Sequence, residues 1–154
     1  MLSIVAVWLK YKNQSIDGQF TKQKVLFSPA ERSFLGVLTR AIEDNGIIFG
    51  KVRVADVITP ISGLSRNRWQ ALFNKISGKH FDFVVCDKDD LSILCAIELD
   101  DKSHNTKSRK IRDEFLKSAC NSANLPLIQI PAKSAYNIDE IRQILITHLS
   151  DGDS

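Results

Sequence analysis

The sequence predicts an α/β fold in which a mixed β-sheet is flanked by helices. Short apolar runs rich in β-branched residues, typical of buried strands, alternate with segments whose apolar residues recur at helical spacing. Two helix starts carry capping-box sequences, at residues 28–31 and 137–140. The resulting order is helix, strand, short helix, strand, strand, helix, strand, helix, which is typical of a sheet layered between helices.

The composition is that of one globular domain with an ordinary core. The chain has 154 residues, of which 44% are hydrophobic and 25% charged. Its net charge of +3 permits a nucleic-acid partner without arguing for one. Cys86, Cys95 and Cys120 are widely spaced in apolar surroundings, which excludes a disulfide framework and a zinc-ligand spacing. We therefore expect reduced thiols in a cytoplasmic protein. Separately, we expect no small-molecule cofactor.

The N-terminal segment, residues 1–24, combines an apolar run with a polar linker. The run at residues 2–9 falls well short of the about 20 residues that cross a bilayer. It predicts a first strand or a loose hydrophobic end, with a peripheral membrane contact as the alternative. The main domain is expected over residues 25–150, followed by a frayed tail at 151–154.

The first helix is predicted to begin at Ser28, within the capping-box sequence Ser28-Pro-Ala-Glu31, and to end at Asn45-Gly46. Its apolar stripe consists of Phe34, Leu35, Leu38, Ala41 and Ile42. Glu31 precedes Leu35 and Leu38 on the same stripe. This carboxylate has two possible roles, closing the helix N-terminus and reaching into an acidic site, and the two can coexist.

The middle of the chain is predicted to hold a strand, a loop and a short helix. Residues 47–58 are β-rich with a break at Gly50, and residues 59–65 contain the proline and glycine of a loop. The helix that follows Arg66-Asn-Arg68 has one apolar face, made of Trp69, Leu72, Phe73 and Ile76.

Two further strands, residues 80–86 and 91–99, are joined by a short polar turn and predict an antiparallel hairpin. A helix over about 108–123 follows, then a short strand at 125–131 and a last helix over 137–149. The apolar stripe of the first of these helices consists of Ile111, Phe115, Ala119 and Ala123, widened by Leu116 and Cys120.

Three carboxylates are expected to converge at one end of the hairpin. Side chains alternate across a strand, so Glu98 and Asp100 share one face, and an in-register hairpin places Asp82 beside Glu98. Such a cluster can take up protons, form ion pairs with basic residues, or bind a divalent cation through oxygen ligands.

These motifs resemble the PD-(D/E)XK nuclease superfamily. The similarity lies in Lys79-His-Phe-Asp82, Ile97-Glu-Leu-Asp-Asp-Lys-Ser-His104, Arg112-Asp113 and Leu125-Pro-Leu-Ile-Gln-Ile-Pro131. It is greatest to a bacterial family of unknown function assigned to that superfamily, in its restriction-endonuclease-like and very-short-patch-repair-like branch. It covers roughly residues 26–146.

The resemblance implies a restriction-endonuclease-like fold and a metal-dependent DNA nuclease that hydrolyses phosphodiester bonds. Asp82 and Glu98 would bind Mg²⁺, or Mn²⁺ in its place, with Asp100 as a further ligand and Glu31 in support. Asp100 stands where the superfamily usually has lysine, and Lys102 or Lys79 would have to replace that cation. His104 is a candidate acid or base, and a solvated loop position is its alternative.

Basic residues on both sides of the acids would bind the DNA backbone. Taken singly, each is better explained as a solvated surface residue, and it is their concentration on both sides of the acids that favours binding. They are Arg66, Arg68, Lys79, Lys102, Lys107, Arg109, Lys110 and Arg112. For Arg112, an ion pair with Asp113 on the helix surface is the alternative. Two other functions stay open: a domain of this fold that binds nucleic acid or a protein partner without cleaving, and a membrane-associated module whose acids are structural. The sequence leaves the oligomeric state undetermined.

Overall fold

The structure, a computed structural model, describes residues 18–100 and 107–150. Four strands form one sheet in the order β1 (Ile47–Arg53), β2 (His80–Cys86), β3 (Ile93–Asp100) and β4 (Leu127–Pro131). β1–β2 and β2–β3 pair antiparallel, whereas β3–β4 pair parallel. The predicted α/β class with a mixed sheet is confirmed, and the described residues form five α-helices around it.

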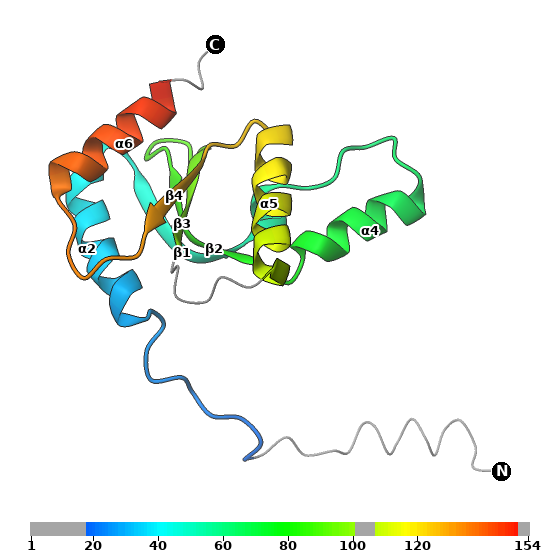
Figure 1. The fold of residues 1–154 in the computed structure, drawn as a ribbon, viewed down its shortest axis with the longest axis horizontal. Helices are drawn as coiled ribbons and strands as arrows, with labels where there is room; N and C mark the ends of the chain where they lie inside the picture. Colours follow the sequence, from blue (N-terminus) through cyan, green and yellow to red (C-terminus); the bar gives the residue numbers. More distant parts are fainter. Residues whose placement is uncertain (1–17, 101–106, 151–154) are drawn as a thin grey trace.

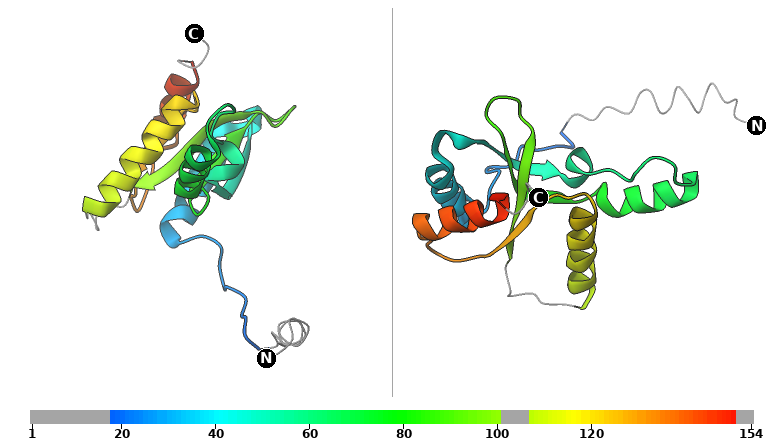
Figure 2. Two further views of the ribbon diagram at one scale, coloured as in Figure 1. Left: turned by 90° about the vertical axis from the view of Figure 1, so that its right-hand side faces the viewer. Right: turned by 90° about the horizontal axis from the view of Figure 1, so that it is seen from above.

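The helices cover both faces of the sheet (Figure 1). One face packs against α2 (Pro29–Ile42) and α6 (Ile138–Ser150), and the other against α5 (Lys107–Ser122). Two shorter helices, α3 (Val54–Val57) and α4 (Arg66–Ile76), follow β1, and the views in Figure 2 show α4 projecting outward from the sheet beside α5. Among the described residues, no helix combines the length and apolar character needed to cross a bilayer.

Helix α2 begins as its capping box predicts. The Ser28 hydroxyl accepts a hydrogen bond from the Glu31 N–H (3.3 Å), and the Glu31 carboxylate accepts one from the Ser28 N–H (2.7 Å). The backbone N–H groups of Ser28 and Glu31, which have no partner within the helix, are thereby satisfied. The helix ends at Ile42, and a single 3₁₀ turn carries the chain to Gly46.

Two separate cores result from the two covered faces. The α2-side core is built from α2, α6 and one face of the sheet, with Phe34, Phe83 and Ile97 fully buried. The α5-side core is smaller and contains Phe81 and Cys120. The three cysteines are buried and unpaired, as their surroundings in the sequence indicate.

The stretch at residues 47–58 differs from its prediction. The strand is continuous through Gly50, and the ring of Phe27 packs where a side chain at Gly50 would lie. It ends at Arg53, and Val54–Val57 turn into a short helix instead of continuing the strand. Asp56, in the first turn of that helix, pairs with Arg53 (2.6 Å), a local contact that strand geometry would not allow.

The face of α5 also differs from its prediction. Leu116 and Cys120, expected to widen the apolar stripe, are its buried centre, while Ile111 is 59% exposed. Phe115 and Ala119 are only partly buried and face α4 across a cavity. The apolar surface of α5 is therefore broader than the sheet alone can cover.

Candidate functional site

Asp82 and Glu98 meet at the end of the β2–β3 hairpin. Phe83 pairs with Ile97, so continuing this register places Asp82 opposite Glu98. Cross-strand pairing stops at that point, and the Asp82 carboxylate accepts a hydrogen bond from the Leu99 N–H (2.8 Å). The paired register of the two strands ends here, and the Asp82 side chain makes the next hydrogen bond across to β3.

Glu98 is the most perturbed carboxyl group of the site. Its side chain lines a small cavity of about 50 Å³ between the end of β3, β4 and α5, together with Arg112 and Asp113. Burial, followed by the negative charges of Asp82 and Asp113, raises the pKa of Glu98 to about 8. Its Oε1 is buried and has no hydrogen-bond partner among the described residues. Glu98 is thus a half-buried acid beside Asp82 and Asp113, and no described residue donates a hydrogen bond to its buried oxygen.

Asp82 is shifted in the same direction and to a smaller extent. Burial raises its pKa, the Leu99 N–H opposes that rise, and the negative charge of Glu31 adds to it. The two facing acids therefore compete for ionisation, as carboxylates that share one site do.

Asp100 lies at the outer rim of the same small cavity. It is exposed, and its backbone carbonyl accepts a hydrogen bond from the Ala132 N–H (2.9 Å). Glu98 and Asp100 share this cavity, as the alternation of the strand requires. Lys102 and His104, the other candidates of this motif, lie outside the described residues, as does the apolar run at residues 2–9.

Glu31 performs both of the roles considered for it. One carboxylate oxygen caps α2, while the other forms an ion pair with Lys51 on β1. Although burial acts to raise it, the pKa of Glu31 is held below its ordinary value by Lys51 and the Ser28 N–H. Glu31 also lies close enough to Asp82 for their side chains to interact.

Lys51 is the member of the site that the sequence did not reveal. Its φ of 56° places it in the left-handed region, which is costly for a residue with a Cβ atom. In a regular strand, Ile48 and Val52 would point to the same face of the sheet. Here Ile48 packs on the α2-side core, whereas Val52 packs on the α5-side core, so the alternation of side chains reverses at Lys51. On β2, Phe83 and Phe81 change sides in the same way across Asp82. The pleat thus inverts at the facing pair Lys51 and Asp82.

Alternation alone could not have identified Lys51, because it assumes an unbroken pleat. A lysine directly after Gly50 in an apolar strand is the one available signal. The sequence predicts Asp113 only as a surface partner of Arg112. That ion pair exists at 3.6 Å, and the negative charge of Asp113 also raises the pKa of Glu98.

The acids of this site are the candidate ligands for a metal ion. In residues 18–100 and 107–150, no three His, Cys, Asp or Glu side chains are arranged to hold one ion together. The pair Asp82 and Glu98 nevertheless has the chemistry of a cation ligand: hard oxygens, mutual repulsion, and one buried oxygen without a donor. The residues present fit a two-carboxylate site, with Asp100 nearby.

The predicted basic residues that the structure describes lie on α5, on α4 and in the turn between α4 and β2. Arg112 lines the cavity of Glu98, and Lys107 and Lys110 lie on the exposed first turns of α5 that lead toward it. Arg66 and Arg68 lie on α4; the side chain of Arg68 lines a different cavity, on the opposite side of α5. Lys79 is partly exposed in the turn between α4 and β2. Arg109 lies within α5, but its side chain is outside the described part.

Comparisons with known proteins identify a family without an assigned activity. No curated protein and no solved structure matches the chain. A family model described as "Protein of unknown function (DUF2726)" matches residues 23–149, which include every described residue of the acidic site. The chain belongs to the DUF2726 family.

Proposed function

We propose that this protein is a metal-dependent nuclease of the PD-(D/E)XK type that hydrolyses phosphodiester bonds in DNA. The observation that carries the proposal is Glu98: a half-buried carboxyl group facing a second acid, with a buried oxygen that no described residue satisfies. A partly buried acid pair of this kind is costly unless a cation or a proton compensates it.

Asp82 and Glu98 would hold Mg²⁺, or Mn²⁺ in its place, with Asp100 nearby at the rim of the cavity. The bound ion would polarise the scissile phosphate and lower the pKa of a coordinated water. Hydrolysis then adds water across one P–O bond: the water oxygen bonds to phosphorus, and the leaving sugar oxygen takes up a proton.

Lys51 would supply the positive charge for which the superfamily uses lysine two residues after the glutamate. Asp100 occupies that position here, whereas Lys51 reaches the acids from the neighbouring strand and is anchored by Glu31. Strained backbone concentrates at functional sites, and the φ of 56° at Lys51 is such a strain. Lys51 would orient the attacking water and offset charge that develops on the phosphate.

The DNA backbone would lie along the first turns of α5. Lys107, Lys110 and Arg112 are exposed there, beside the rim of the acidic cavity. Contacts of this kind bind phosphates without reading sequence and weaken with salt.

A plasmid-nicking assay tests the proposal. The wild-type protein should nick supercoiled DNA in Mg²⁺ or Mn²⁺, and Glu98→Gln, Asp82→Asn and Lys51→Met should each lower the rate by about 100-fold or more. Asp89→Asn is the matched control, because Asp89 is an exposed acid in the hairpin turn and pairs only locally, with Lys88. Nicking that survives Glu98→Gln, or that proceeds in excess chelator, would contradict the assignment.

The second candidate is a domain of the same fold that binds nucleic acid or a protein partner without cleaving it. Asp100 at the usual lysine position favours it, as does the lack of a third ligand among the described residues. It predicts salt-dependent DNA binding, unchanged by Glu98→Gln, with no nicking in either metal. Fluorescence anisotropy with labelled duplex, run beside the nicking assay, separates the two candidates.

A further inference from the structure

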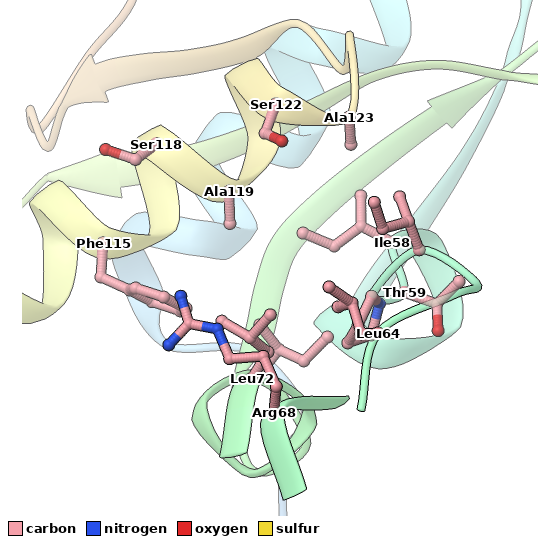
Figure 3. A pocket seen from close by; sticks show the side chains of 13 residues that line it. Ile58, Thr59, Leu64, Arg68, Leu72, Phe115, Ser118, Ala119, Ser122 and Ala123 are labelled. Carbon is pink, nitrogen blue, oxygen red and sulfur yellow. The ribbon is translucent and has the colours of Figure 1, made fainter. Parts of the chain in front are cut away.

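We propose that the cavity between α4, the loop before it and α5 binds a small amphipathic anion, an alkyl carboxylate whose chain is buried and whose carboxylate pairs with Arg68. The cavity holds about 390 Å³ and is distinct from the acidic site (Figure 3). This volume lies within the range of small-molecule sites in proteins. The inference is independent of the proposed nuclease activity.

The walls of the cavity are mainly aliphatic. Ile58 and Leu64 line it from the loop, Leu72 from α4, and Ala119 and Ala123 from α5 (Figure 3). The small alanine side chains of α5 leave this space open. The broad apolar stripe of α5 therefore ends in a pocket instead of a packed interface.

One positive charge lies at this cavity, on the exposed side chain of Arg68. Arg68 is the one charged residue among those that line it, and Figure 3 shows its guanidinium extending from α4 toward Phe115. Lys75, two turns further along α4, lies over the Phe115 ring at 4.9 Å from its centroid. Among the described residues, neither side chain forms an ion pair with a carboxylate.

These features select a ligand with two unlike ends. An aliphatic wall favours a hydrocarbon chain, since burying each methylene contributes about 0.8 kcal/mol. An unpaired guanidinium favours a carboxylate, which it can bind through two parallel hydrogen bonds. A nucleobase fits less well, because its polar edge would meet Ile58, Leu64 and Leu72.

Decanoate is a suitable probe, used with the full-length chain below its micellar concentration. Methyl groups of Ile58, Leu64 and Leu72 should shift in two-dimensional methyl NMR spectra and saturate at one equivalent. Arg68→Gln should weaken decanoate binding about tenfold while leaving the binding of decanol unchanged, because only the charged contact is lost. Arg66→Gln is the matched control, since Arg66 is exposed on the same helix and does not line the cavity.

Filling the cavity provides a second test. Ala119→Leu should abolish decanoate binding, with the methyl spectrum outside the cavity unchanged. The proposal fails if decanoate shifts none of the three methyl groups, or if Arg68→Gln and Arg66→Gln bind it equally. It also fails if a thymidine oligonucleotide shifts the same methyl groups and displaces decanoate, which would assign the cavity to a nucleobase. None of these results depends on whether the protein cleaves DNA.

Discussion

The carboxylate of Asp82 accepts a hydrogen bond from the backbone N–H of Leu99 at 2.8 Å, directly beside Glu98. This bond replaces the cross-strand pairing that ends at Phe83 and Ile97. Asp82 therefore has a structural role, closing the end of the hairpin, in addition to any role in binding a cation. The two roles respond differently to substitution.

Asp82→Asn keeps an acceptor for the Leu99 N–H, whereas Asp82→Ala removes it. We expect the alanine variant to be less stable than the asparagine variant by about 1–2 kcal/mol, because a partly buried donor loses its partner. Urea unfolding of both variants measures the difference. Equal stabilities would mean that water replaces the carboxylate and that the bond does not hold the strands.

The free energy of unfolding should depend on pH through Glu98. Burial and its acidic neighbours raise the folded-state pKa of Glu98 to about 8, from an ordinary value of 4.5. Between these values the folded chain keeps a proton that the unfolded chain has lost. Stability contributed by Glu98 is thus present below about pH 4.5 and is lost as the pH rises through 8, by up to about 1.4 kcal/mol per pH unit.

Glu98→Gln removes this dependence, because glutamine mimics the protonated acid at every pH. Urea unfolding in chelator at several pH values between 5 and 9 should give a shallower decline for this variant, which becomes more stable than wild type at the alkaline end. Glu114→Gln, at an exposed acid of α5, is the control and should follow the wild-type curve. Parallel curves for wild type and Glu98→Gln would contradict the raised pKa.

Two substitutions at Lys51 separate the effect of backbone strain on stability from the effect of the ion pair with Glu31. Lys51→Gly and Lys51→Ala both lose the contact with Glu31, but only glycine adopts a φ of 56° without a Cβ penalty. We expect the glycine variant to be the more stable by about 1 kcal/mol in thermal or urea unfolding. At Arg53, whose φ is −63°, the order should reverse, with alanine the more stable.

Gly50 should not tolerate a side chain. A Cβ atom there would lie 2.3 Å from Cζ of Phe27, whose ring stacks on Phe83 with centroids 5.6 Å apart. Gly50→Ala should lower stability by about 1–3 kcal/mol, and adding Phe27→Leu should recover part of that loss. Gly36→Ala is the control: its Cβ would meet open space on α2, and it should gain about 0.5–1 kcal/mol. Thermal unfolding of these three variants and of wild type measures the differences in stability.

Local rules predicted much of this fold and part of the site. The capping box placed the start of α2, the short turn placed the hairpin, and strand alternation placed Glu98 and Asp100 in one cavity. These features depend on neighbours in sequence, or on a regular pleat, and both can be read from residue types.

The features that sequence reasoning missed depend on tertiary structure. Lys51 reaches the acids because its backbone is in the left-handed region, a conformation that a lysine in the sequence does not indicate. Asp113 acts on Glu98 only once α5 carries the chain across the sheet to β4. The cavity beside the apolar stripe of α5 likewise depends on how α4 is placed against α5.

The inverted pleat at Lys51 also bears on how readily the edge of the sheet can pair with another molecule. β1 lies at one edge of the sheet and pairs only with β2 among the described strands, and Ile47 and Phe49 are 39% and 42% exposed on it. A flat, apolar edge of this kind is a template for strand addition by another molecule. The left-handed residue interrupts the row of backbone donors and acceptors and sets a charge in it, so the distortion that aims a lysine at the acids also discourages fibrillar stacking.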